Sequence, residues 1–344
     1  MIEPEPTFEQ KLVKAWHAKV SWLWLLLPLS LLFRFIVFIR RIVLQTFFQG
    51  EAFAVPVIVV GNISVGGSGK TPLIIALATE LAGRGFSVAI VSRGYGGQAP
   101  SYPLDVEADT AVEHCGDEPL LIRQKLANRG CYVVVDPDRN RAVNFVLQQH
   151  DCDLVLCDDG MQHYRLHRDA EIAVVDGSRG FGNGFCLPVG PLREPISRLA
   201  STTFVAVNGE FDFDGNIAPD INYSLQPVCF RQLATGQIVP IAEWALSDTV
   251  HAVAAIGNPQ RFANTLQSLG FEVILLRFDD HEVMTEFDLT FEDNYPVIIT
   301  AKDAVKFTKT DLDHVWVLEV DVTLPEPFVN DVLSSVGLPQ TQSF

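Results

Sequence analysis

Short apolar runs alternate with stretches of helical spacing along the first half of the chain. The runs are four to seven residues long and rich in Val and Ile, which is typical of strands buried on both faces of a parallel sheet. This alternation predicts an α/β fold, with a doubly wound and mostly parallel sheet and helices on both faces. The expected strands are Val57–Val60, Ser87–Ser92, Tyr132–Val135, Asp153–Asp159 and Glu171–Asp176.

The pattern breaks at Phe211–Asp220, where Asp, Gly, Asn and Pro cluster, and this stretch is the expected hinge. Beyond it the alternation resumes, with strands expected at Ala252–Ile256, Glu272–Leu276, Val297–Thr300 and Val315–Val320. The prediction is a core domain over residues 51–210 and a smaller α/β domain over residues 211–344. The smaller domain is expected to close over a ligand cleft.

Residues 1–50 form a third segment, with six Lys and Arg against three Glu. Its unbroken apolar run, Trp22–Phe33, is short for a span, and Pro28 and Arg34 interrupt the longer run. This favours an amphipathic or re-entrant helix on the cytoplasmic face of a membrane, with its arginines on anionic lipid. A single membrane span and a helix buried in the protein's own core are the alternatives.

The remaining composition narrows the function classes. The net charge of −17 excludes a generally basic nucleic-acid binder. The six cysteines are scattered, without a C-x-x-C pair or zinc-like spacing, which indicates reduced core residues of a cytosolic protein.

The strongest chemical signal is a glycine-rich stretch between the first strand and a helix that opens at Gly69-Lys70-Thr71. This order is typical of a phosphate-binding P-loop, in which the lysine reaches the β- and γ-phosphates and the threonine hydroxyl binds Mg²⁺. Together with the predicted sheet, it indicates a P-loop NTPase-type α/β fold. One departure is Ser64, which stands where the usual motif has its first glycine. The loop residues are Ser64, Val65, Gly66, Gly67, Ser68, Gly69, Lys70 and Thr71.

Acidic and glycine-rich motifs follow the later strands. Asp158 and Asp159 end an apolar strand, which is the Walker-B arrangement that puts an acid beside Mg²⁺. Asp117 and Glu118 precede a helix and are either ordinary helix caps or the acceptor of a hydroxyl proton. The turn Arg93–Gly97 is either a ligand loop or a flexible loop.

Eight motifs occur in one order over nearly the whole chain: VGNISVGGSGKTP, SRGYGG, GDEP, DDGMQH, GPLREP, IGNPQRF, FDDH and TAKDAVK. In this set and order the sequence resembles the tetraacyldisaccharide 4'-kinases, the lipid A kinases of Gram-negative bacteria. The resemblance implies an enzyme that uses ATP and Mg²⁺ to phosphorylate the 4'-hydroxyl of a tetraacylated glucosamine disaccharide 1-phosphate. It also implies a position on the cytoplasmic face of the bacterial inner membrane, peripheral or anchored by the N-terminal segment. The implied partners are the acylated lipid and the membrane surface, without nucleic acid or a required protein partner.

The resemblance also assigns roles residue by residue. Residues 64–71 match the ATP phosphate loop, Asp117 matches the expected general base, and His281 of FDDH matches its partner. We hypothesise that domain closure brings His281 onto Asp117. The residues matching positions near the metal are Thr71, Glu118, Asp158 and Asp159, and those matching lipid-binding positions are Gln162 and Arg193.

Two motifs depart from the family pattern. Glu282 follows His281 where a second histidine is common, and Ala301 stands where Thr-Glu-Lys-Asp has its glutamate. The alternatives from other classes are a P-loop regulatory or maturation NTPase that acts through protein partners, and a membrane scaffold with a relic nucleotide site. GTP is disfavoured because Lys302-Asp303 lacks the residue between them in the Asn-Lys-x-Asp pattern of guanine readers.

Overall fold

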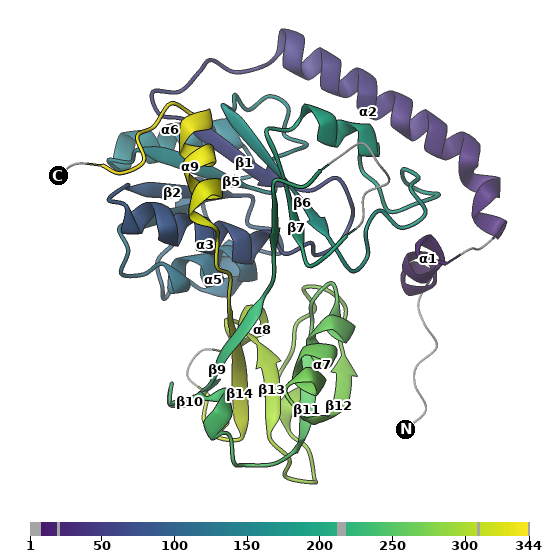
Figure 1. Cartoon of the computed structure of the whole chain (residues 1–344), viewed down its shortest axis with the longest axis vertical. Coiled ribbons are helices and arrows are strands. Elements are labelled where there is room, and N and C mark those ends of the chain that lie inside the picture. Colours follow the sequence, from purple (N-terminus) through teal and green to yellow (C-terminus); the bar gives the residue numbers. More distant parts are fainter. Residues whose placement is uncertain (1–7, 19–20, 212–217, 308–309, 343–344) are drawn as a thin grey trace. The chain divides into compact units, whose positions relative to one another are not determined.

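The computed structural model describes residues 8–18, 21–211, 218–307 and 310–342, and Figure 1 labels the helices and strands. The chain divides into two compact units, each built from separate stretches of sequence. Unit 1 takes the chain up to Lys70, Asp153–Tyr223 and Pro325–Gln342, whereas unit 2 takes Thr71–Cys152 and Ser224–Leu324. The sequence predicted three consecutive segments, residues 1–50, 51–210 and 211–344. This division differs from the two units and stays a prediction. Most of the expected hinge, residues 212–217, lies outside the described residues.

Unit 1 contains five parallel strands in the order β5-β1-β6-β7-β8. All residues of the first four of these strands are buried, which explains their continuous Val- and Ile-rich sequences. The strands are β1 (Val57–Gly61), β5 (Leu154–Asp158), β6 (Ala170–Asp176), β7 (Phe204–Asn208) and β8 (Ile221–Tyr223). The C-terminal helix α9 (Glu326–Ser335) also belongs to this unit, and its Phe328 packs edge-on against Phe204.

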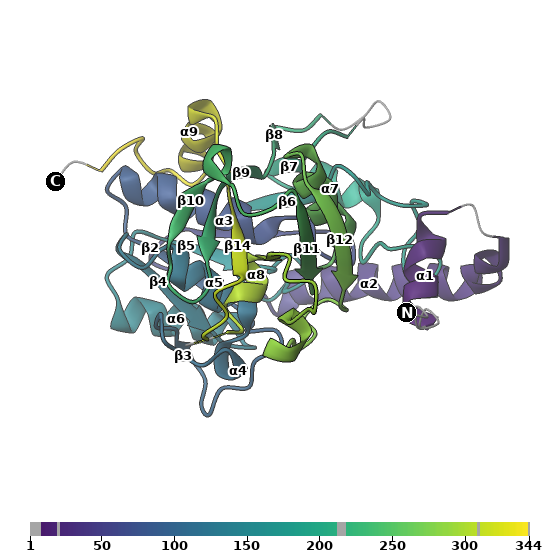
Figure 2. The ribbon, with the colours of Figure 1, turned by 90° about the horizontal axis from the view of Figure 1, so that it is seen from below.

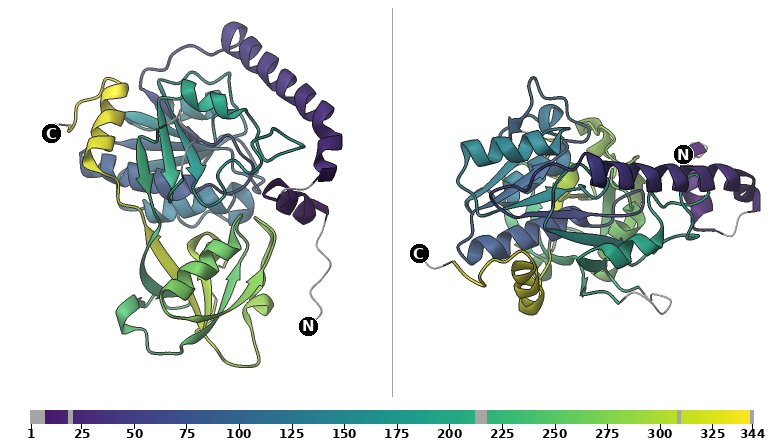
Figure 3. Two further views of the ribbon diagram at one scale, coloured as in Figure 1. Left: turned by 45° about the vertical axis from the view of Figure 1, so that its right-hand side comes forward. Right: turned by 90° about the horizontal axis from the view of Figure 1, so that it is seen from above.

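The N-terminal helices α1 (Phe8–Trp16), η1 (Ser21–Leu26) and α2 (Leu27–Phe47) complete unit 1. Trp16 and Leu23 pack with Val189 in a small apolar cluster, and the Trp16 indole donates to Pro188 O at 3.0 Å. Figures 1 and 3 show α2 as the long helix of this unit. A single side of α2 is half-buried or buried, at spacings of three and four residues: Ser30, Phe33, Val37, Arg41 and Leu44.

The two residues that interrupt the apolar run do not break α2. Pro28 lies in the first turn of the helix, where the missing N–H has no helical partner to lose. The helix also continues through Arg34, so Trp22–Phe47 forms 26 helical residues that are long and apolar enough to cross a membrane. The interpretation as a core helix is wrong, because only 11% of its most apolar window is buried.

The first part of unit 2 pairs β2 (Val88–Ser92) in parallel with β4 (Cys131–Val135), and β3 (Leu104–Asp105) lies antiparallel at the edge. Helix α3 (Lys70–Gly83) begins at the glycine-rich loop and continues into this unit. The other helices of this part are α4 (Val112–Cys115), α5 (Asp117–Lys125) and α6 (Arg139–Gln149). The side chain of Asp138 caps α6 by accepting from two backbone N–H groups.

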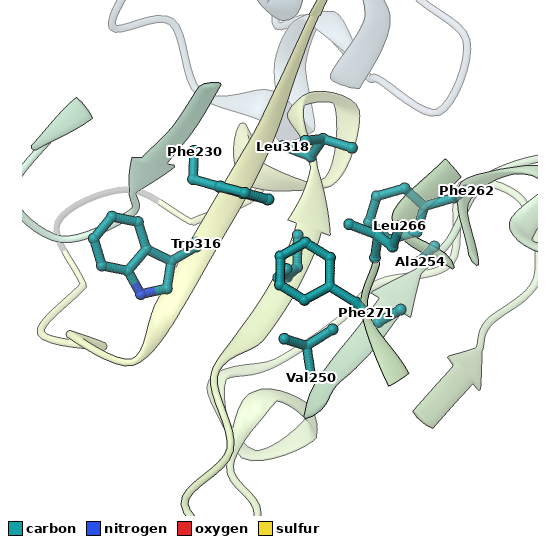
Figure 4. Close-up of a cluster of buried hydrophobic side chains, with 10 residues drawn as sticks. Phe230, Val250, Ala254, Phe262, Leu266, Phe271, Trp316 and Leu318 are labelled. Carbon is teal, nitrogen blue, oxygen red and sulfur yellow. The ribbon is translucent and has the colours of Figure 1, made fainter. Parts of the chain in front are cut away.

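The second part of unit 2 is a six-stranded sheet in the order β10-β9-β14-β13-β11-β12. Helix α7 (Pro259–Ser268) packs on β11 and β12 (Figure 2). Figure 4 shows the apolar cluster in which Phe230, Phe271 and Trp316 meet residues of α7 and the sheet. The remaining elements are β9 (Gln226–Gln232), β10 (Ile238–Pro240), η3 (Ile241–Glu243), β11 (Thr249–Ala254), β12 (Glu272–Arg277), η4 (Glu286–Leu289), β13 (Val297–Thr300), α8 (Ala301–Ala304) and β14 (Val315–Asp321).

These pairings confirm the predicted α/β class with mostly parallel strands. The antiparallel pairs are confined to β3, β9 and β10 in the described residues. Strands β3, β7, β8, β9 and β10 were not expected from the sequence. Four of them are short or half-exposed, so they lack the continuous apolar run that revealed the other strands.

Candidate active site

The glycine-rich loop leads from β1 into α3, so that Lys70 is the first residue of the helix. Gly66 and Gly69 have φ angles of 96° and 91°, which residues with a side chain rarely adopt. A β-carbon at Gly69 would lie 2.1 Å from the side-chain nitrogen of Asn208. A loop of this kind before a helix N-terminus turns backbone N–H groups toward a bound anion.

Neighbouring segments of unit 1 hold this loop by its backbone. Ser64 forms an isolated bridge with Leu192 of the GPLREP motif. The Asn208 amide at the end of β7 donates to Ser68 O at 3.2 Å, and the Tyr223 hydroxyl donates to the next carbonyl at 2.8 Å. Sequence analysis missed Asn208 and Tyr223. The available signal for Asn208 was a polar residue at the carboxyl end of a strand.

Lys70 forms an ion pair with one of the two acids at the end of β5. Its Nζ lies 3.3 Å from Asp159 Oδ1, and Arg193 Nη1 lies 3.3 Å from Asp159 Oδ2. Burial would raise the pKa of the Asp159 carboxyl, but Lys70 and Arg193 lower it below its ordinary value. Asp158 is the last residue of β5 and is 1% exposed.

The two residues expected at the lipid lie together beside this ion pair. Gln162 Nε2 donates to Asn62 O at 3.0 Å and to Glu194 Oε1 at 2.8 Å. Arg193 Nη1 lies 3.5 Å from Gln162 Oε1. Gln162 therefore contacts two residues of the GPLREP segment, Arg193 and Glu194. Unit 1 therefore brings Lys70, Asp159, Gln162 and Arg193 into one cluster.

A buried ion-pair network anchors the GPLREP segment. Arg198 is 2% exposed, and its Nη2 donates to both carboxylate oxygens of Glu171 on β6 at 2.7 and 2.6 Å. Arg198 Nε lies 3.3 Å from Glu194 Oε2. Sequence analysis missed this network because its residues lie outside the motif signals, apart from Glu194.

The GDEP motif begins helix α5 in unit 2. Gly116, with a φ of 87°, ends α4, and Asp117 is the first residue of α5. A β-carbon at Gly97 would lie 2.6 Å from Gly116 N, so the Arg93–Gly97 turn packs backbone against backbone on the start of α5. The turn is thus part of the structure that positions Asp117, which is 4% exposed.

His281 contacts Asp117 directly. Its Nδ1 lies 3.0 Å from Asp117 Oδ1 and 3.1 Å from Oδ2. The backbone of His281 has a φ of 65°, and its N–H bonds to Ala255 O at 3.3 Å. The Tyr95 ring meets the imidazole at a centroid distance of 4.9 Å with an interplanar angle of 62°.

Charge neighbours shift the pKa of both members of this pair. Burial would raise the pKa of Asp117, but the hydrogen bond with His281 and the nearby Lys302 lower it. Burial and Lys302 lower the pKa of His281, whereas the Asp117 carboxylate raises it and prevails. The pair is therefore a carboxylate held in its ionised form beside an imidazole.

Lys302 of the TAKDAVK motif adjoins the same pair. Its Nζ lies 2.9 Å from Glu118 Oε1, 3.3 Å from Asp280 Oδ1 and 3.2 Å from His281 Nε2. These acids raise the pKa of the lysine above its ordinary value despite its burial. Sequence analysis quoted the motif but gave Lys302 no role, because its position at the start of α8 does not reveal its neighbours.

The described residues contain no group of three or more His, Cys, Asp or Glu that could hold a metal ion alone. Mg²⁺ does not require such a cage, because it binds through one or two carboxylates, substrate phosphates and water. The oxygen donors of Thr71, Asp158 and Asp159 suit it chemically. Glu118 is already engaged in the ion pair with Lys302.

These observations define a class of protein. A glycine-rich loop between a strand and a helix, a lysine at the helix start and acids at the end of the adjacent parallel strand are typical of P-loop phosphotransferases. The Asp117–His281 contact adds an ionised carboxylate paired with an imidazole.

Comparison with known proteins identifies the family. The chain matches the family described as tetraacyldisaccharide-1-P 4'-kinase over residues 22–337, and it belongs to this family. A tetraacyldisaccharide 4'-kinase of Stutzerimonas stutzeri is 46% identical over 301 residues, covering 86% of this chain and 87% of the relative. The Pseudomonas aeruginosa protein of the same name is 42% identical over 328 residues, covering 94% and 96%.

A solved structure agrees with this assignment. The crystal structure of LpxK from Aquifex aeolicus in complex with ATP superimposes with a TM-score of 0.74 at 28% identity, covering 92% of this chain and 100% of that chain. The chain is therefore a kinase, and its reaction is ATP-dependent 4'-phosphorylation in lipid A biosynthesis. This confirms the resemblance and decides against the regulatory NTPase and the scaffold.

Proposed function

We propose that Asp117 is the general base of this kinase and that residues 64–71 bind the phosphates of ATP. The 4'-oxygen of the acylated disaccharide 1-phosphate forms a bond to the γ-phosphorus of ATP. The bond from that phosphorus to the β,γ-bridging oxygen breaks, ADP leaves, and the hydroxyl proton passes to Asp117. The observation that carries this proposal is the contact between His281 Nδ1 and Asp117 Oδ1 at 3.0 Å.

The surroundings of Asp117 suit this role. A free carboxylate is a weak base for an alcohol, so its value in catalysis depends on being held at the attacking oxygen. Gly116 fixes the start of α5, and the imidazole of His281 contacts both oxygens of the carboxylate. The orientation of a catalytic acid or base by a hydrogen-bonded partner is the arrangement found in catalytic triads.

ATP is assigned to the loop because its backbone and Lys70 can neutralise phosphate charge. Lys70 is paired with Asp159, so phosphate oxygens compete with that carboxylate for the ammonium. We assign Thr71 with Asp158 or Asp159 as the protein ligands of Mg²⁺, and Glu118 as a partner of Lys302. Mg²⁺, when bound, offsets the charge that develops on the transferring phosphoryl group.

The lipid substrate is assigned to the side of unit 1 that carries Gln162 and Arg193. A groove of about 430 Å³ lies between α2 and the segment after Arg193. Its lining combines apolar and cationic side chains, which suits acyl chains beside an anionic headgroup. The lining residues used here are Leu31, Arg34, Phe35, Phe38, Arg41 and Pro195.

We further place the enzyme on the cytoplasmic face of the bacterial inner membrane through α2. Leu25 in the preceding η1 is 82% exposed, and Phe35 and Phe38 of α2 are 61% and 57% exposed, although water is a poor solvent for such side chains. Their burial in a bilayer, with arginines at the headgroups, removes that cost. A tetraacylated substrate also stays in the bilayer, because each buried CH₂ is worth about 0.8 kcal/mol.

The test is transfer of labelled γ-phosphate from ATP to the acylated disaccharide 1-phosphate in detergent micelles. Lys70→Ala should abolish the labelled lipid because the phosphates lose their cation. Asp117→Asn should lower kcat by about 10²- to 10⁴-fold, the usual contribution of a general base. Asp313→Asn is the matched control, since residue 313 has a side chain that is 87% exposed.

The outcomes separate the parts of the proposal. An Asp117→Asn enzyme within a few-fold of wild type would remove Asp117 from the reaction. Lipid phosphorylation that survives in Lys70→Ala would place ATP elsewhere.

A further inference from the structure

The side chain of Arg179 lies against the glycine-rich loop of unit 1. A β-carbon built at Gly66 would lie 3.2 Å from Arg179 Nη1. Apart from the chain neighbours of Gly66, no other atom of the described residues lies within 4 Å of that position. The guanidinium therefore lies where a side chain at residue 66 would point. Glycine is required there both for its φ of 96° and for this close approach.

Arg179 belongs to a turn, residues 176–180, that begins at the last residue of β6 and is called the β6 turn below. Asp176 Oδ1 accepts from the backbone N–H of Ser178 at 2.9 Å and from its hydroxyl at 2.7 Å. The N–H of Gly180 donates to Asp176 O at 2.8 Å. A β-carbon at Gly180 would lie 2.2 Å from the ring of Phe211, so this ring packs directly on the turn. These contacts fix the backbone from which Arg179 extends.

The β6 turn and the glycine-rich loop also share one support, Asn208 at the end of β7. Asn208 O accepts from the N–H of Gly177 at 2.9 Å, and its side-chain amide donates to Ser68 O at 3.2 Å. A single residue thus bonds to the turn on one side and to the loop on the other. The approach of Arg179 to the loop is therefore built into the fold of unit 1.

The order of the strands places Arg179 across the loop from the acids. Strand β1 pairs with β5 on one side and with β6 on the other, so the ends of β5 and β6 flank the loop that follows β1. Asp159, at the end of β5, already balances Lys70 and Arg193. Arg179 adds a positive charge from the β6 side.

A cation at this place suits phosphoryl transfer. Negative charge is spread over the three outer oxygens of the transferring group, and in several P-loop NTPases an arginine from the same chain or from a partner stabilises that charge. The planar guanidinium can donate two parallel N–H bonds to phosphate oxygens, which an ammonium group cannot do. Arg179 brings this group to the loop that is proposed to hold the phosphates.

We propose that Arg179 is a catalytic residue that binds the γ-phosphoryl group of ATP beside Gly66 and stabilises its charge during transfer. This inference rests on the proposed phosphate loop and deepens it, because it names a further cation that the chain itself supplies. ADP lacks the γ-phosphoryl group. Arg179 therefore contributes to the binding of ATP and little to the binding of the product nucleotide.

A purely structural role for Arg179 makes a different prediction. The β6 turn lies near the end of α1, where burial and the positive charge of Arg179 lower the pKa of His17, whereas Asp176 raises it. If Arg179 were needed only for this packing, its removal would loosen the turn and the loop together. The affinities for ADP and for ATP analogues would then fall by the same factor.

The test measures nucleotide binding as well as turnover. Calorimetric titration of the full-length chain in detergent with Mg²⁺ gives Kd for ADP and for the non-hydrolysable β,γ-imido analogue of ATP. Arg179→Ala should raise Kd for the analogue by at least about tenfold, the loss expected for hydrogen bonds to a charged group, and Kd for ADP by less than about threefold. In the phosphate-transfer assay, kcat should fall by about 10³-fold.

Two further variants control this comparison. Arg129→Ala removes the same charge at an exposed position in unit 2 and should leave both Kd values and kcat unchanged. Arg179→Lys keeps the charge but not the planar fork. It should bind ADP as the wild type does and still lose at least about tenfold in kcat, so that the result does not depend on the folding of Arg179→Ala.

The inference is overturned if Arg179→Ala binds both nucleotides with wild-type affinity, if it weakens both equally, or if its kcat stays within a few-fold of wild type. Lys70→Ala separates this result from the proposed function. If Lys70→Ala weakens both nucleotides and Arg179→Ala weakens neither, the phosphate loop stands and Arg179 alone is refuted. Unchanged affinities in Lys70→Ala would refute the phosphate loop and the inference with it.

Discussion

Lys70 and Asp159 form an ion pair in unit 1, with 3.3 Å between Nζ and Oδ1, and Arg193 contacts the second oxygen of the same carboxylate. The Asp159 carboxylate thus pairs with Lys70, which is proposed to bind ATP, and with Arg193, which is proposed to bind the lipid. Binding of phosphates to Lys70 changes the charge balance at Asp159.

The first prediction concerns Asp159→Asn. This change removes the negative charge that balances Lys70 and Arg193. It also removes a proposed carboxylate ligand of Mg²⁺, so kcat should fall by about 10²-fold. The Mg²⁺ concentration that gives half-maximal rate should also rise. Initial rates over a Mg²⁺ series check both effects, with Asp313→Asn as the control. An unchanged Mg²⁺ dependence would assign the metal to Asp158 instead.

The second prediction concerns the glycine turn that packs on the start of α5. Gly97→Ala should cost about 1–3 kcal/mol of unfolding free energy and lower kcat, because the new β-carbon meets backbone atoms and displaces Asp117. Gly83→Ala is the control, since a β-carbon there has no atom within 4 Å. It should be neutral or stabilising by up to about 1 kcal/mol. Urea unfolding gives the stability of each variant, and initial rates give kcat. If Gly97→Ala and Gly83→Ala changed the unfolding free energy and kcat equally, the packing argument would be contradicted.

The third prediction concerns the exposed side of α2. Leu32 and Ile36 lie one turn apart and are 52% and 54% exposed. Replacing both by serine should lower partitioning onto anionic vesicles by about 10²-fold, at roughly 1.5 kcal/mol for each buried side chain. Co-sedimentation measures this. The control replaces Val228 and Ile238, which are 47% and 63% exposed on the second sheet, and should bind as wild type does.

The fourth prediction is a pH dependence of stability from Glu319. Burial would raise the pKa of this carboxyl, but ion pairs with Lys125 and Arg231 lower it below the ordinary 4.5. Its stabilisation is therefore fully present above about pH 4.5 and is lost as the pH falls through the lower value in the folded state.

Glu319→Gln should consequently destabilise the chain at pH 7 by about 1–3 kcal/mol and by much less near pH 3. Urea unfolding at several pH values gives the difference between variant and wild type. Glu243→Gln, at an exposed position, should give no such difference. A gap that stays constant from pH 7 to about pH 3 would show that the carboxylate charge contributes nothing.

The sequence predicts the parts of the fold that repeat a local rule. Strands such as β1, β5 and β6 are fully buried, so their unbroken apolar runs identify them. Half-exposed β9 follows no such rule, because antiparallel pairing with β14 stabilises it. Arg34 interrupts the apolar run but not α2, because a long exposed helix tolerates a cation that a buried one excludes.

The candidate site is predictable only where its residues share a motif. Lys70 and Asp159 follow from the order of strand, loop and helix. Lys302 does not, because its contact with Glu118 joins positions 184 residues apart. Contacts between residues so far apart in sequence depend on how the strands of the second sheet are ordered. The local sequence does not predict that order.

Within the described residues, the chain passes between the two units four times, at residues 70/71, 152/153, 223/224 and 324/325. Neither unit is therefore a continuous piece of sequence, and helix α9 supplies the last part of unit 1. During synthesis on the ribosome, unit 1 cannot be completed until nearly the whole protein has emerged. A nascent chain that already exposes α2 thus still lacks the final helix of the unit that carries the glycine-rich loop.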